Sequence, residues 1–255
     1  MKYPEFPVKC KSLLSQYLTP EVFASLKHKK TSNGITLEQV IHSGVVNVDS
    51  GIGVYAGDQE SYNVFALLFD PIIKAYHGFN KEDRHKSNLN PDDLHAPNPD
   101  PEGAYIVSTR IRVGRNVKYM PLGPGISKEQ RDQVESSIVK GLQALEDELS
   151  GAYYPLLGMS KEVQNSLIED HFLFKEGDRF LDAAGLNRHW PEGRGIYHNN
   201  DKTFLVWVNE EDQLRIISMQ EGGDIKEVFT RLVKAIKMIE TKVPFSYSDH
   251  LGYIT

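Results

Sequence analysis

A stretch without apolar periodicity divides this chain into two parts with different patterns. Residues 86–103 (KSNLNPDDLHAPNPDPEG) are rich in proline, asparagine and aspartate. Such a composition favours an irregular linker between separately packed units. We therefore expect two domains, residues 1–85 and residues 104–255, joined by the linker 86–103.

The first part carries helix signals and few strand signals. Pro20 and Glu21 follow Thr19 in a pattern typical of a helix start, and Thr36 and Gln39 have the spacing of a capping box. Alternation of apolar and polar residues is scarce here. The sequence thus predicts a small all-helical N-terminal domain.

The second part mixes strand and helix patterns. Apolar and polar residues alternate over 105–113, and the β-rich runs TFLVWV (203–208) and LRIISM (214–219) are separated by an acidic turn. Ser127 and Asp224 have the context of helix N-caps. An apolar stripe follows the first cap: Val134, Ile138, Leu142, Leu145 and Leu149. We expect an α+β fold in which helices flank an antiparallel sheet.

Composition narrows the class of protein. Charged residues make up 25% of the 255-residue chain, and the formal net charge is -6, so no overall positive field attracts nucleic acid or anionic lipid. The single cysteine, Cys10, excludes an internal disulfide, and no run of 18 apolar residues occurs. We expect a cytoplasmic protein with no membrane or nucleic-acid partner. The sequence gives no signal for oligomeric state.

Arg110 and Arg112 are the first candidates for chemistry. Two residues apart on a strand, they project from one face about 7 Å from each other. Arginine forks at that spacing suit adjacent phosphates, although a pair of solvated arginines is the simpler interpretation.

Three further features have both a functional and a simpler interpretation. The loop 49–55 (DSGIGVY) has two glycines that allow a close approach to a ligand, but it is also compatible with an ordinary turn, and no phosphate-binding glycine motif occurs in the chain. Glu211 and Arg215 lie at the hairpin turn, and His171 lies between acids and aromatics. Each is also compatible with a solvated or packed surface residue.

The combination of motifs is more specific than its members. YIVSTRIRVGRN, DHFLFKEGDRFL, NRHWPEGRGIYHN and TFLVWVNEEDQLRIISMQEGGD follow one another, and VDSGIGVYAGDQESYNVFALLFDPII precedes them. In order and spacing these segments resemble the phosphagen kinases, also called ATP:guanidino kinases, and within that family most closely the arginine kinases. The resemblance covers nearly the whole chain.

The resemblance implies a fold, an activity and a site. Phosphagen kinases have a helical N-terminal domain and a catalytic domain built on an antiparallel sheet. They transfer the γ-phosphoryl group of ATP reversibly to a guanidino nitrogen, and Mg²⁺ is held through the nucleotide phosphates without a protein metal site. By matching motif, the implied catalytic residues are Glu211, Arg110, Arg112 and Arg215. The implied ATP-binding residues are Ser108, Thr109, Arg110, Ile111, Arg112, His171 and Arg215. The implied substrate-binding residues are Ser50, Gly51, Ile52, Gly53, Val54, Tyr55 and Glu211.

Substrate identity depends on few positions. Tyr76 stands where arginine kinases resemble one another in having tyrosine, which favours L-arginine as the small-molecule guanidino substrate. The sequence departs from the family pattern in reading YHGF and EEDQL. Those departures leave taurocyamine or another guanidine open.

The ending DHLGYIT precedes the family's cysteine-containing segment. We therefore expect the catalytic domain to be incomplete and this chain by itself to be inactive. A non-catalytic nucleotide-binding or partner module is the alternative function.

Overall fold

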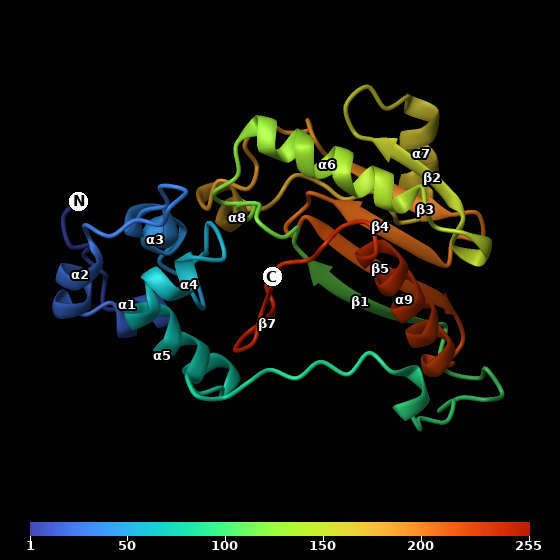
Figure 1. The fold of residues 1–255 in the computed structure, drawn as a ribbon, viewed down its shortest axis with the longest axis horizontal. Coiled ribbons are helices and arrows are strands. Elements are labelled where there is room, and N and C mark those ends of the chain that lie inside the picture. The colour runs from blue at the N-terminus through green and yellow to red at the C-terminus, as the bar shows by residue number, and fades with distance from the viewer.

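The computed structural model describes residues 1–255, in which a helical part lies beside a five-stranded sheet (Figure 1). The helical part has five helices: α1 (Leu13–Tyr17), α2 (Pro20–Leu26), α3 (Leu37–Val46), α4 (Ser61–Val64) and α5 (Ala66–His77). The predicted caps form, because the hydroxyl of Thr19 accepts the N–H of Val22 and Thr36 makes both bonds of a capping box with Gln39. A core of fifteen buried residues holds these helices together.

The chain then runs through residues 86–103, where a short 3-10 turn, η1 (Pro91–Asp93), is the single regular element. The division into domains 1–85 and 104–255 stays a prediction.

The sheet is antiparallel throughout, in the order β1-β5-β4-β3-β2. Its strands are β1 (Ser108–Arg115), β2 (Gly151–Pro155), β3 (Gly195–Asn199), β4 (Phe204–Val208) and β5 (Leu214–Glu221). The accompanying helices and turns are α6 (Lys128–Leu142), η2 (Asp147–Leu149), α7 (Lys161–Glu169), α8 (Arg179–Ala183) and α9 (Ile225–Glu240). A small hairpin, β6 (Tyr247–Ser248) and β7 (Gly252–Tyr253), follows. The predicted α+β fold, with helices flanking an antiparallel sheet, is confirmed.

The two faces of the sheet are covered differently. One face carries α6 and α9 and is turned toward the viewer in Figure 1; we call it the back. There Ile138 of α6 and Ile236 of α9 pack against Val206 and Ile216 in a core of nineteen buried residues. On the opposite face, the front, α7 and the segment after it cover Ile196, Leu205 and Ile217 in a smaller cluster. That cluster covers β3, β4 and β5 and leaves β1, at the edge of the sheet, outside it.

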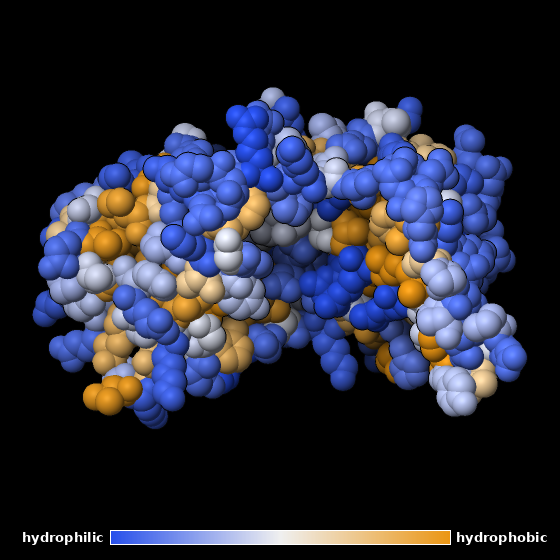
Figure 2. Space-filling view, turned by 90° about the horizontal axis from the view of Figure 1, so that it is seen from below, coloured by the Kyte–Doolittle hydropathy of each residue, from blue (hydrophilic) through white to orange (hydrophobic).

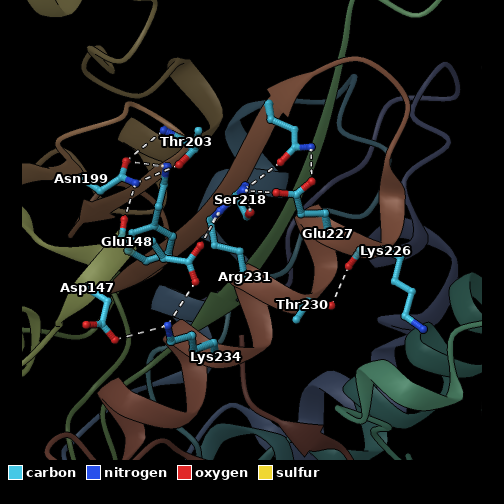
Figure 3. Close-up of polar contacts among 12 residues, drawn as sticks. Asp147, Glu148, Asn199, Thr203, Ser218, Lys226, Glu227, Thr230, Arg231 and Lys234 are labelled. Atoms are coloured by element: carbon cyan, nitrogen blue, oxygen red, sulfur yellow. Dashed lines mark hydrogen bonds and ion pairs between the residues drawn. The ribbon is translucent and has the colours of Figure 1, made fainter. Parts of the chain in front are cut away.

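A buried arginine ties α9 to the back of the sheet. Arg231 donates to Gln220 and Glu227 at 2.8 and 3.2 Å and lies 3.7 Å from a carboxylate oxygen of Glu148 (Figure 3). Its side chain is 7% exposed. Because burying a guanidinium without such contacts is costly, the network stabilises this docking.

Two expectations about element boundaries were wrong. The strand starts at Ser108, and Tyr105 and Val107 are 90% and 85% exposed. The reason is that the Asp100 carboxylate accepts the N–H groups of residues 104–106 and folds them into a turn. Likewise α6 ends at Leu142, so Leu145 and Leu149 reach the same core from the turns beyond the helix.

The C-terminal segment lies between the two parts (Figure 1). Ile254 belongs to the helical core, while Tyr253 packs against the back-face core. No helix has both the length and the apolar content needed to cross a bilayer.

Candidate active site

Arg110 and Arg112 lie on the front face of the sheet. Their cross-strand partners on β5 are Met219 and Ile217, and residues directly opposite in an antiparallel pair share a face. Both arginines are exposed and make no hydrogen bond or ion pair within the chain. Two unneutralised guanidinium groups on one strand form a site that an anion with several negative charges would stabilise.

The other residues of this strand behave differently. Ile111 packs against the back-face core, and the Thr109 hydroxyl donates to the Gly222 carbonyl at 2.7 Å. Ser108 begins the strand and is exposed. The structure therefore does not bring the side chains of Thr109 and Ile111 to the arginine face, and a role for them in nucleotide binding would use backbone atoms.

Arg215 joins the two strand arginines from the neighbouring strand. It is opposite Gly114 on the same face, with its guanidinium 5.6 Å from the Trp207 ring centre. It also forms ion pairs with Glu210 at 3.2 Å and Glu211 at 2.9 Å. The hairpin turn thus brings the candidate acid and a candidate phosphate-binding arginine into direct contact.

Glu211 also faces a cavity of about 550 Å³ between the helical part and the sheet. The whole loop 50–55 lines this cavity, together with Tyr76 from α5. In the space-filling view the outline is indented between the two parts, with hydrophilic residues at the indentation (Figure 2). The structure therefore brings together the acid and all six loop residues that the sequence indicated as substrate-binding.

The loop is held on the helical part by its carbonyl groups. Those of Gly51 and Ile52 accept the N–H groups of Leu13 and Leu14, at 3.0 and 2.9 Å. By contrast, the N–H groups of residues 51–54 have no hydrogen-bond partner in the chain. Four consecutive unpaired donors beside a cavity are suited to bind a carboxylate.

Two glycines set the position of this loop. Gly53 has φ +91°, a conformation that favours glycine, and a Cβ atom on Gly44 of α3 would lie 2.2 Å from the Gly53 carbonyl oxygen. The loop backbone therefore rests directly on the helix backbone, with no side chain between them.

The acids around the cavity shift the ionisation of their neighbours. Burial, Glu211 and Asp178 raise the pKa of the Tyr55 hydroxyl, which stays protonated and able to donate a hydrogen bond at neutral pH. Burial and the neighbouring Glu211 raise the pKa of the Asp212 carboxyl to about 6. The turn holds three acids, and its ion pairs all go to one cation, Arg215.

His171 lies on the front side of the sheet, in the segment that follows α7. The indole N–H of Trp207 donates to the Phe172 carbonyl at 2.9 Å, and Phe172 and Phe174 pack against the front-face cluster. His171 itself is exposed with φ +57°. Its neighbours are thus anchored over the front face while its ring stays accessible.

Asp178, Phe180 and Leu181 also line the cavity, and the sequence reasoning missed them. The available signal was Asp178 itself, which caps α8 by accepting the N–H groups of Phe180 and Leu181. A cap position predicts a helix start, but it does not indicate which cavity that start faces.

The comparisons with known proteins agree with this arrangement. Residues 8–74 match the family described as ATP:guanido phosphotransferase, N-terminal domain, and residues 133–255 match the ATP:guanido phosphotransferase, C-terminal catalytic domain. Over 252 residues the chain is 57% identical to arginine kinase Lit v 2 of Penaeus vannamei. The aligned region covers 98% of this chain and 71% of that protein.

Solved structures give the same result. The chain is similar to lombricine kinase, with a TM-score of 0.95 and 37% identity over 99% of this chain and 71% of the other. It is also similar to the substrate-free duplicated taurocyamine kinase from Schistosoma mansoni, with a TM-score of 0.92 and 38% identity over 98% of this chain and 36% of the other. The chain belongs to the ATP:guanido phosphotransferase family, whose members are the phosphagen kinases. The predicted family is thereby confirmed.

Proposed function

We propose that this protein catalyses reversible transfer of the γ-phosphoryl group from MgATP to L-arginine, giving phosphoarginine and ADP. The observation that carries the proposal is the single cavity lined by Glu211, the loop 50–55 and Tyr76. Its acid suits the guanidinium group of an amino acid, and its unpaired N–H groups suit the carboxylate.

The front-face arginines support the nucleotide half of the reaction. Phosphoryl transfer depends mainly on positioning and on stabilising charge at the transferring group. Arg110 and Arg112 carry unneutralised charge on the same face as Arg215, which touches Glu211. We assign these arginines to the ATP phosphates and His171 to the base or ribose, with Mg²⁺ held through the phosphates.

Glu211 has two roles in this reaction. Its carboxylate pairs with the planar guanidinium by two parallel hydrogen bonds and aims one nitrogen at the γ-phosphorus. As the N–P bond forms, the P–O bond to ADP breaks and the nitrogen loses a proton, which we assign Glu211 to accept because it pairs with the guanidinium.

Similarity favours arginine over the other guanidines. The chain is 57% identical to an arginine kinase, compared with 37% to a lombricine kinase and 38% to a taurocyamine kinase. Tyr76 adds a cavity hydroxyl and no further cation. Phosphoryl transfer to arginine would act in buffering cellular ATP, as we expect for a cytoplasmic protein.

Binding measurements test the substrate assignment. Calorimetry of L-arginine with wild type and Glu211→Gln should show affinity falling about 10- to 100-fold, since a hydrogen bond to a charged group contributes about 1.5–3 kcal/mol. Glu221→Gln, an exposed acid at the end of β5, is the matched control and should bind as wild type does. Equal affinities for wild type and Glu211→Gln would refute the assignment.

Turnover is a separate question, because the relatives extend beyond the matched residues and the chain covers 71% of their length. That the 255 residues alone are inactive stays a prediction. An assay for ADP and phosphoarginine with this chain, MgATP and arginine tests it, and turnover like that of the full-length relatives would overturn it. Nucleotide binding without any transfer would instead favour a non-catalytic module.

A further inference from the structure

The substrate cavity contains a second acid that the proposed reaction does not use. Of the residues lining it, Asp178 and Glu211 are the two that carry a charge. Glu211 comes from the turn between β4 and β5, whereas Asp178 is the residue immediately before α8. The lining residues therefore carry two negative charges before any ligand enters, and that of Glu211 is already paired with Arg215 of β5.

The Asp178 carboxylate has one oxygen free for a ligand. Its Oδ1 atom accepts the N–H groups of Phe180 and Leu181 at 2.9 and 3.1 Å, and Oδ2 makes no hydrogen bond within the chain. The adjacent Arg179 is directed elsewhere, since its guanidinium pairs with Asp49 and with the Asn47 side chain. Asp178 consequently has no ion pair within the chain.

The position of Asp178 is fixed by contacts between α3 and α8. The Ser43 hydroxyl donates to the Phe180 carbonyl at 2.7 Å, which holds the start of α8 against the helix that supports the loop 50–55. Asp178 and Glu211 also both act on the Tyr55 hydroxyl. Asp178, Glu211 and Tyr55 therefore all line the same cavity.

The charges of the cavity match those of an α-amino acid with a guanidino side chain. Such a ligand has two cations, the guanidinium and the α-ammonium, and one carboxylate. Glu211 takes the first cation in the proposed function, and the unpaired N–H groups of the loop take the carboxylate. We infer that Asp178 binds the α-ammonium group and so selects guanidino compounds that carry an α-amino group.

This inference rests on the proposed function and extends it to specificity. A guanidine without an α-amino group leaves the Asp178 carboxylate in a filled cavity without a counter-charge, which disfavours binding. Asp178 is thus a specificity-determining residue that acts against ligands such as taurocyamine.

Two ligands and two variants test whether Asp178 recognises the α-amino group. L-Arginine and 5-guanidinopentanoate differ by the α-amino group alone, and both are titrated calorimetrically into the 255-residue chain. Asp178→Asn removes the charge but keeps a side-chain oxygen to cap α8. Asp182→Asn, an exposed acid of the same helix outside the cavity, is the matched control.

We expect Asp178→Asn to weaken L-arginine binding by about 10- to 100-fold and to leave 5-guanidinopentanoate binding no weaker than in wild type, because the uncompensated charge is removed. Asp182→Asn should bind both ligands as wild type does. Equal loss for both ligands in Asp178→Asn, or no loss for either, would overturn the inference while leaving the proposed function intact. If wild type binds neither ligand, the proposed function fails and the inference fails with it.

Discussion

The two faces of the sheet use arginine in opposite ways. On the back, Arg231 is 7% exposed and contacts Glu148, Glu227 and Gln220 (Figure 3). On the front, Arg110 and Arg112 are exposed and have no partner in the chain. The same residue type therefore stabilises the fold on one face and is available to a ligand on the other.

The difference gives a criterion for separating arginines that stabilise the fold from arginines that are free to bind an anion. A guanidinium whose charge is already neutralised has little to gain from a phosphate, whereas one repelled by its neighbour gains from any polyanion. Arg215 is intermediate, since it lies on the front face but is paired with Glu210 and Glu211.

The largest expected effect comes from removing a front arginine. Arg112→Ala should weaken MgADP binding by about 10- to 100-fold, because charge-assisted hydrogen bonds to phosphate contribute about 1.5–3 kcal/mol. Its melting temperature should stay close to that of wild type, since the side chain is exposed and makes no hydrogen bond or ion pair in the chain. Calorimetry and thermal melting measure the two quantities. Arg84→Ala, an exposed arginine beyond the end of α5, is the control. Undiminished MgADP affinity in Arg112→Ala would break the comparison.

A back-face substitution should show the reverse. Arg231→Met should lower the free energy of unfolding by about 2 kcal/mol, from lost contacts to Ser218 and Gln220, while the half-exposed acids regain water. MgADP affinity of the folded protein should not change. Denaturant unfolding is the measurement, with Lys226→Met on the exposed side of α9 as control. Weakened nucleotide binding in Arg231→Met at unchanged stability would contradict the structural role.

The smallest effect concerns the acidic turn at the front. The folded pKa of Asp212, about 6, lies above its ordinary value, so the folded chain holds this proton more tightly than the unfolded chain does. The resulting stabilisation is complete below about pH 4 and is lost as the pH rises through 6. Asp212→Asn should therefore raise stability by about 1 kcal/mol at pH 8 and hardly at all at pH 4. Melting curves at both pH values test this, with exposed Asp201→Asn as control. An equal gain at both pH values would exclude a titration effect.

Local chemistry was enough to predict several elements. The capping boxes at Thr36 and Ser127 marked two helix starts because both of their bonds join residues three apart. The antiparallel hairpin of β4 and β5 was predictable for the same reason, since its turn is local.

Long-range contacts explain what the sequence could not predict. Tyr105 and Val107 fit a strand pattern, but Asp100 takes the backbone donors of that segment. The sequence analysis missed Asp178, because its place in the cavity depends on the packing of α8 against α3. Pattern alone assigned the arginine face of β1, but it could not show which arginines the fold neutralises.

The contact between Gly44 and Gly53 has a consequence for redesign of the proposed substrate cavity. Because the loop backbone rests on the α3 backbone, the floor of the cavity is fixed, and the loop has no room to sink toward the helix. A larger or smaller guanidine must then be accommodated by trimming or enlarging the side chains at Ile52 and Val54. Libraries that vary these two positions and keep both glycines would test new guanidine acceptors without displacing the loop 50–55.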